Sequence, residues 1–164
     1  MAGNSGDDQD VFLSINETPI YFQEDWNTGI GGGLWSTGLA IAKYFERHHS
    51  DVSDNLKQLA EIKRTEGEDD GISAIELGSG NGFLSVCLLA LAQESSLSLK
   101  NVVVTDMADH LSLMEDTIRT NCHVWKELNV RREGSLSTFY GKASSTHSVD
   151  VAEYEWGISD FDEK

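Results

Sequence analysis

The middle of the chain holds the feature that most constrains its fold. Residues 72–77 are a short, mostly apolar run, residues 78–82 read Gly-Ser-Gly-Asn-Gly, and residues 83–92 are almost entirely apolar. A second apolar run follows at residues 101–106. Because glycine clusters mark turns between buried elements, we interpret this order as strand, turn, helix and strand. Such an order is typical of a parallel sheet covered by helices, and it predicts an α/β fold.

Patterns nearer the N-terminus add a hairpin and a helix. Residues 11–15 and 19–22 predict two short strands joined by a tight turn. Apolar side chains then recur every three to four residues, at Trp35, Leu39, Ala42 and Phe45. This period predicts a helix that ends near His48 and His49.

The region after the second buried strand is less regular. Leu111, Met114 and Ile118 have helical spacing and predict an amphipathic helix. Residues 124–148 mix Arg, Ser, Gly and Lys without a clear period, so we expect a loop there with at most one irregular element. Residues 149–154 are a candidate third strand.

The chain carries a strong negative charge. A formal net charge of −16 over 164 residues works against binding to phosphate groups, which requires Lys and Arg. We therefore expect neither nucleic acid nor an anionic membrane as a partner. The N-terminus does not resemble a signal peptide, and no run approaches the roughly 18 apolar residues that a membrane span requires. These features predict an intracellular protein of the cytoplasm or the nucleus.

The sequence predicts no metal site. Cys87 and Cys122 have neither CxxC nor metal-ligand spacing, so we expect both to be reduced thiols in packing positions. The histidines show no ligand spacing either, and we expect surface or packing roles for all five. They are His48, His49, His110, His123 and His147.

The glycine turn is a candidate ligand site. Gly78, Gly80 and Gly82 stand between a buried strand and a helix, where they allow positive φ angles and a close approach of a ligand to the backbone. Glycine turns before helices also arise for packing reasons, so the glycines alone leave both interpretations open. A dinucleotide fingerprint requires a third glycine at the position of Phe83, which disfavours a nucleotide-linked oxidoreductase.

Asp106 ends the second buried strand, so it is expected at the same sheet edge as the glycine turn. Its carboxylate is suited to accept hydrogen bonds from both hydroxyls of a ribose. The alternative is that Asp106 caps the next helix. The combination with the glycine turn favours an adenosyl site, in which Met107 would lie against an adenine.

Several segments together resemble methyltransferase family 16, the seven-β-strand protein-lysine methyltransferases. These segments are residues 33–45 with their Leu-Trp-Ser-Thr-Gly run, 75–85 with Glu-Leu-Gly-Ser-Gly-Asn-Gly, 103–107 with Val-Val-Thr-Asp-Met, Asn121, and Glu155-Trp-Gly. Many class I methyltransferases share the glycine motif, whereas the upstream tryptophan helix and the downstream Trp-Gly are more specific to this family. The resemblance covers about residues 29–158 and implies a Rossmann-like sheet that binds S-adenosylmethionine.

The resemblance also implies roles for individual residues. Glu76, Gly78 and Gly80 would hold the methionine end of S-adenosylmethionine, and Asp106 would bind its ribose. Met107 and Trp156 would contact the adenine, and Trp35 would close the pocket from the N-terminal side. For both tryptophans the alternative is plain core packing. The implied acceptor is a lysine side chain of another protein.

The chain departs from this family after the Trp-Gly segment. The Asp-x-x-Tyr motif that helps bind the acceptor lysine in the family does not follow, and the sequence ends at Lys164. We therefore expect an incomplete fold, with the first three sheet strands after the N-terminal hairpin and helix. A catalytically inactive fragment that acts through protein contacts is the alternative to an active enzyme. An incomplete sheet would also be poorly stable and would gain from a stabilising partner.

These expectations define one partial domain. Residues 1–10 are polar and expected to be disordered, residues 11–49 hold the hairpin and helix, residues 50–71 form an acidic linker, and residues 72–164 form the cofactor-binding region. Within the linker, one face of a short helix could be lined by Leu56, Leu59 and Ile62.

Overall fold

A computed structural model describes residues 13–22, 24–65, 71–94, 99–124, 128–141 and 148–155. The helices are α1 (Ser36–Thr65), α2 (Phe83–Glu94) and α3 (Leu111–Thr120). The strands are β1 (Leu13–Ile15), β2 (Thr18–Ile20), β3 (Ile72–Leu77), β4 (Leu99–Asp106), β5 (Leu128–Glu133), β6 (Leu136–Gly141) and β7 (Ser148–Glu153). Short 3₁₀ turns cover Trp26–Thr28, Ile30–Gly32, Ala108–His110 and Cys122–Val124.

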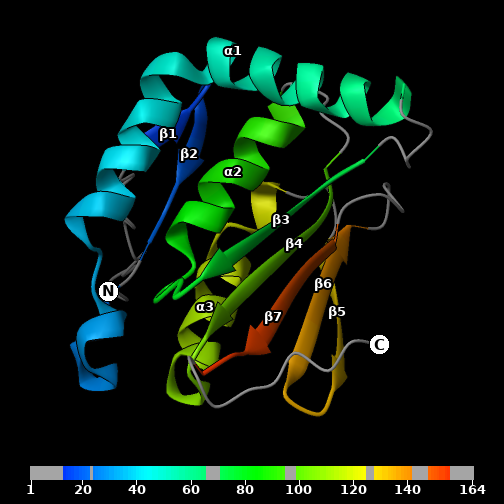
Figure 1. Cartoon of the computed structure of the whole chain (residues 1–164). Coiled ribbons are helices and arrows are strands. Elements are labelled where there is room, and N and C mark those ends of the chain that lie inside the picture. The colour runs from blue at the N-terminus through cyan, green and yellow to red at the C-terminus, as the bar shows by residue number, and fades with distance from the viewer. Residues whose placement is uncertain are drawn as a thin grey trace, which may run out of the picture.

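A mixed five-stranded sheet forms the centre of the molecule, in the order β3, β4, β7, β6, β5 (Figure 1). β3, β4 and β7 are parallel to one another, whereas β6 is antiparallel to β7 and β5 is antiparallel to β6. The three parallel strands are the three that the sequence predicts. The α/β prediction is therefore confirmed, and the arrangement is consistent with a methyltransferase fold.

The helices form a layer on one side of this sheet (Figure 1). α2 and α3 pack against each other and against β4, and α1 packs against α2 and β1. Alternate residues of the central strands point into this layer and are buried, among them Val102, Val104, Val149 and Val151. Phe83, at the start of α2, is also in this core and makes an edge contact with Phe22. No helix in the described part of the chain is long and apolar enough to cross a membrane.

The predicted end of the first helix, near His48 and His49, coincides with a kink in α1. α1 continues through 30 residues to Thr65, with one non-helical residue, His48, at φ −123° and ψ 27°. The apolar period stops at this kink because the helix changes direction there, and it resumes in the second half of α1. The short helix expected around Leu59 is this second half, so residues 50–65 of the predicted linker are helical.

The prediction of a loop between residues 124 and 148 is wrong. β5 and β6 form an antiparallel hairpin that extends the sheet beyond β7. Most of β5 is exposed, so it lacks the alternation of apolar and polar residues that identifies a strand in a sequence. Gly134, at φ +63°, makes the turn between the two strands.

The face of the sheet opposite the helices has no helix against it in the described ranges. Ile75 and Leu77 of β3 point to this face and are 53% and 44% exposed. β3 is also an edge strand, with β4 as its single neighbour among the described strands. An exposed edge with apolar side chains is a surface on which another chain can pair.

Candidate functional site

A cavity of about 360 Å³ lies at the carboxyl ends of β3 and β4, where the sequence predicts a ligand. Gly78 and Asp106 both contribute to its wall, which confirms that they share one crevice. The cavity brings together five of the seven predicted site residues: Trp35, Glu76, Gly78, Gly80 and Asp106. Its size falls within the roughly 300–1,000 Å³ of typical small-molecule sites.

The glycine turn has the backbone conformation that the sequence predicts. Gly78, Gly80 and Gly82 have φ angles of +67°, +57° and +73°. Residues other than glycine rarely adopt such positive φ angles. Gly80 also has a neighbour close by, because a Cβ atom at this position would lie 2.5 Å from the carbonyl oxygen of Gly31. The turn therefore requires glycine both for its conformation and for the approach of the N-terminal segment.

Asp106 is almost fully engaged by protein groups. Its Oδ2 accepts a hydrogen bond of 2.6 Å from the backbone N–H of Gly80. Its Oδ1 lies 2.7 Å from the backbone nitrogen of Met107 and 2.8 Å from Nδ1 of His110. A carboxylate has about four acceptor positions, so about one remains for a ligand hydroxyl. Asp106 is not the N-cap of the following 3₁₀ turn or of α3, which begin after Met107 and His110.

Glu76 supplies a second carboxylate to the cavity. Burial raises the pKa of Glu76, and the nearby charge of Asp106 raises it further, while a hydrogen bond from the hydroxyl of Ser85 partly offsets both effects. The end of β3 is tied to β4 through the carbonyl oxygen of Glu76, which accepts a hydrogen bond of 2.8 Å from the hydroxyl of Thr105. The carboxylate is thus held on a rigid strand end.

The two carboxylates give the cavity its chemical character. No lysine or arginine is among the described residues that line it. Such a wall disfavours a pyrophosphate and favours a ligand with cationic groups. The backbone N–H groups at the start of α2 and the side-chain amide of Asn81 add hydrogen-bond donors. Asn81 is 3% exposed, and its Nδ2 has no partner among the described residues.

The aromatic residues and Met107 have different positions. Trp35 lies on the cavity and is 59% exposed, so the alternative of core packing is wrong for this residue. Met107 is 45% exposed next to Asp106 but does not line the cavity. Trp156 lies outside the described residues.

Sequence reasoning missed Gly31 and His110. Gly31 lines the cavity, and His110 is 2% exposed behind Asp106. The available signal was the spacing of four residues between Asp106 and His110, which brings side chains together where a helical turn follows a strand. Without metal-ligand spacing, a separation of four residues does not by itself distinguish a functional contact from packing.

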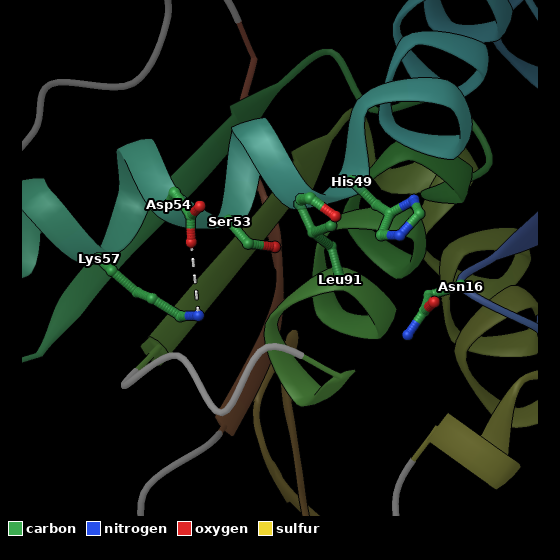
Figure 2. Close-up of a pocket in the computed structure, with 7 residues that line it drawn as sticks. Asn16, His49, Ser53, Asp54, Lys57 and Leu91 are labelled. Carbon is green, nitrogen blue, oxygen red and sulfur yellow. Dashed lines mark ion pairs between the residues drawn. The ribbon is translucent and has the colours of Figure 1, made fainter.

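A second cavity of about 400 Å³ lies beside the kink of α1. Figure 2 shows its lining, in which Lys57 forms an ion pair of 3.7 Å with Asp54. His49 and Ser53 of α1 and Leu91 of α2 also contribute. None of the predicted site residues lies there, so the slightly larger volume does not make it the better candidate.

Comparison with known proteins adds an independent result. A family model described as lysine methyltransferase, methyltransferase family 16, matches residues 14–136. This range includes the tryptophan helix, the glycine turn and Asp106. No match was found among curated proteins. Because the family model spans most of the chain, the chain belongs to this lysine methyltransferase family.

Proposed function

We propose that the chain binds S-adenosylmethionine as the cofactor of a protein-lysine methyltransferase. The observation that carries the proposal is the composition of the cavity wall. Glu76, Asp106 and the glycine turn line it, and no lysine or arginine is among its described residues. S-adenosylmethionine has a sulfonium and an ammonium group, which such a wall accepts better than the phosphates of a dinucleotide. The family relationship supports the same donor, because S-adenosylmethionine is the usual one for methyltransferases.

Each predicted residue has a role in this proposal. Glu76, Gly78 and Gly80 hold the methionine end, with the Glu76 carboxylate near the ammonium group. Asp106 binds one ribose hydroxyl through its remaining acceptor position. To bind the second hydroxyl as well, its carboxylate would have to release one of its present hydrogen-bond donors, which are Gly80, Met107 and His110.

The aromatic contacts complete the proposed site. Trp35 covers the cavity from the N-terminal side, where it forms part of the wall. Met107 and Trp156 contact the adenine. For Met107, the supporting observation is its exposed position directly after Asp106.

When bound, the cofactor would supply an electrophilic methyl group for transfer to a neutral lysine amine. The chain contributes by fixing the donor on two strand ends. No acceptor-side residue is assigned to the described part of the chain. A net charge of −16 would steer a lysine-rich protein surface toward the site.

Methyl transfer can be tested with labelled S-adenosylmethionine. The chain, the variant Asp106→Ala and a buffer control are each incubated with cell lysate and the labelled donor. We expect label on protein lysines with the wild-type chain and a large reduction with Asp106→Ala. Equal labelling in all three samples would contradict the proposed activity.

A non-catalytic role through protein contacts is a second candidate. The exposed Ile75 and Leu77 on the open face of the sheet favour it, because they form a surface that a partner could cover. Binding of S-adenosylhomocysteine without labelling of any protein would support this candidate. The two free cysteines, Cys87 and Cys122, fit the reducing interior of a cell for either role.

A further inference from the structure

His110 is a buried histidine that none of the roles above uses. Its side chain is 3% exposed, and its Nδ1 lies 2.8 Å from Oδ1 of Asp106. An ionised carboxylate only accepts hydrogen bonds, so Nδ1 carries the hydrogen and donates it. The carboxylate of Asp109 lies farther from the same nitrogen, at 3.8 Å, and is largely exposed. Asp106 is therefore the principal partner of this nitrogen.

The other side of the imidazole ring is fixed by the N-terminal segment. A Cβ atom at Gly31 would lie 2.2 Å from Cε1 of His110, so the ring occupies the space of the missing side chain. The carbonyl oxygen of Gly31 in turn lies close to Gly80. The backbone N–H of Gly80 donates a hydrogen bond to Asp106. The four residues form a closed ring of contacts, and three of them, Gly31, Gly80 and Asp106, line the cavity.

We propose that His110 is a positioning residue of the cofactor site, which holds the carboxylate of Asp106 and is itself held in place by Gly31. This inference rests on the proposed function, because it assigns the residue a role toward the same ligand. With Oδ1 engaged by His110 and Met107, rotation of the carboxylate is restricted, and Oδ2 keeps its open acceptor position toward the cavity.

The alternative is that His110 only packs in the core and does not position Asp106. The two roles differ in which property of the side chain matters. Packing depends on the ring, which His110→Phe retains while it loses the hydrogen bond. Positioning depends on the hydrogen bond, which His110→Asn retains, because the amide nitrogen of asparagine occupies a place similar to that of Nδ1.

The experiment measures the affinity for S-adenosylhomocysteine by calorimetry and the Tm of each variant without ligand. We expect His110→Phe to bind about tenfold more weakly, as for the loss of one hydrogen bond to a charged group. His110→Asn should bind within about threefold of wild type although its Tm falls, because its smaller side chain leaves a void beside Gly31. Gly31→Ala, which displaces the ring from the opposite side, should weaken binding as His110→Phe does.

His123→Phe is the matched control. His123 is exposed, and its ring nitrogen bonds the carbonyl oxygen of Pro19, so its replacement should not change the affinity. Affinities of His110→Phe and His110→Asn that follow their Tm values would show that His110 only packs. Unchanged affinity in His110→Phe would also overturn the positioning role and leave the proposed function intact. A wild-type chain that binds no S-adenosylhomocysteine would overturn the proposed function and the role of His110 with it.

Discussion

At the scale of single residues, the close approach of Gly80 to Gly31 is the tightest contact of the glycine turn. We expect Gly80→Ala to lower the free energy of unfolding by more than the roughly 1–2 kcal/mol cost of a left-handed residue, because its Cβ meets Gly31. Gly134→Ala is a matched control, since Gly134 has φ +63° and nothing within 4 Å of the added atom. Chemical denaturation of both variants gives the comparison. Equal losses would show that the contact with Gly31 is unimportant.

Glu76 should reveal a conflict between stability and binding. Its pKa is raised by burial, so ionisation of Glu76 destabilises the folded state as pH rises above the ordinary glutamate value. Glu76→Gln should therefore have a higher Tm than wild type at pH 7.5, and the difference should shrink as the pH falls to about 4.5, near the unperturbed pKa of glutamate. The same variant should bind S-adenosylhomocysteine more weakly. A lower Tm at pH 7.5 would contradict this view of the carboxylate.

Residue-level prediction from the sequence succeeded where local chemistry determines position. The glycines and Asp106 follow directly after strands, and parallel strands bring their carboxyl ends to one edge. Gly31 and His110 were missed because their contact joins a loop before α1 to a turn after β4. Such a contact depends on the tertiary arrangement, which no single segment encodes.

At the scale of elements, one glutamate connects α3 to the hairpin that the sequence did not predict. Glu115 accepts a hydrogen bond of 2.6 Å from the hydroxyl of Ser137 and contacts the guanidinium groups of Arg119 and Arg132. We expect Glu115→Ala to cost about 1–2 kcal/mol, because a largely buried acceptor of several donors is removed. Denaturant unfolding measures this loss.

Glu61→Ala is the control for that measurement. Glu61 pairs with Arg64 on the solvent side of α1, where water screens the ion pair. No measurable change in stability is expected for this variant. A Glu115→Ala variant as stable as Glu61→Ala would mean that β5 and β6 do not depend on α3.

Elements with apolar runs were predictable from the sequence. β3, β4 and β7 have such runs and were all found; in β4 and β7 the apolar residues that face the helices are buried, whereas Ile75 and Leu77 of β3 are exposed. β5 is exposed along most of its length, so pairing with β6 rather than burial determines its conformation. The second half of α1 is a polar helix on the surface, and its composition resembled that of a linker.

At the scale of the whole molecule, the open face of the sheet is the surface most prone to self-association. We expect residues 1–164 to self-associate through β3, because Ile75 and Leu77 of this edge strand are exposed. Ile75→Lys should increase the monomer fraction in sedimentation velocity, since a charge on an edge strand opposes pairing. Val130→Lys, on the opposite edge strand β5, should have little effect. A wild-type chain that stays monomeric with one sharp unfolding transition would contradict this expectation.

The central claim is that the cavity at the ends of β3 and β4 is a site for S-adenosylmethionine. A calorimetric titration tests it most directly, with S-adenosylhomocysteine and NAD as ligands of the wild-type chain and of Asp106→Ala. The account predicts one site for S-adenosylhomocysteine, no binding of NAD, and a loss of at least about 1.5–3 kcal/mol of binding free energy in Asp106→Ala. Binding of NAD to the wild-type chain would contradict this claim. Equal affinity of the wild-type chain and of Asp106→Ala for S-adenosylhomocysteine would also contradict it.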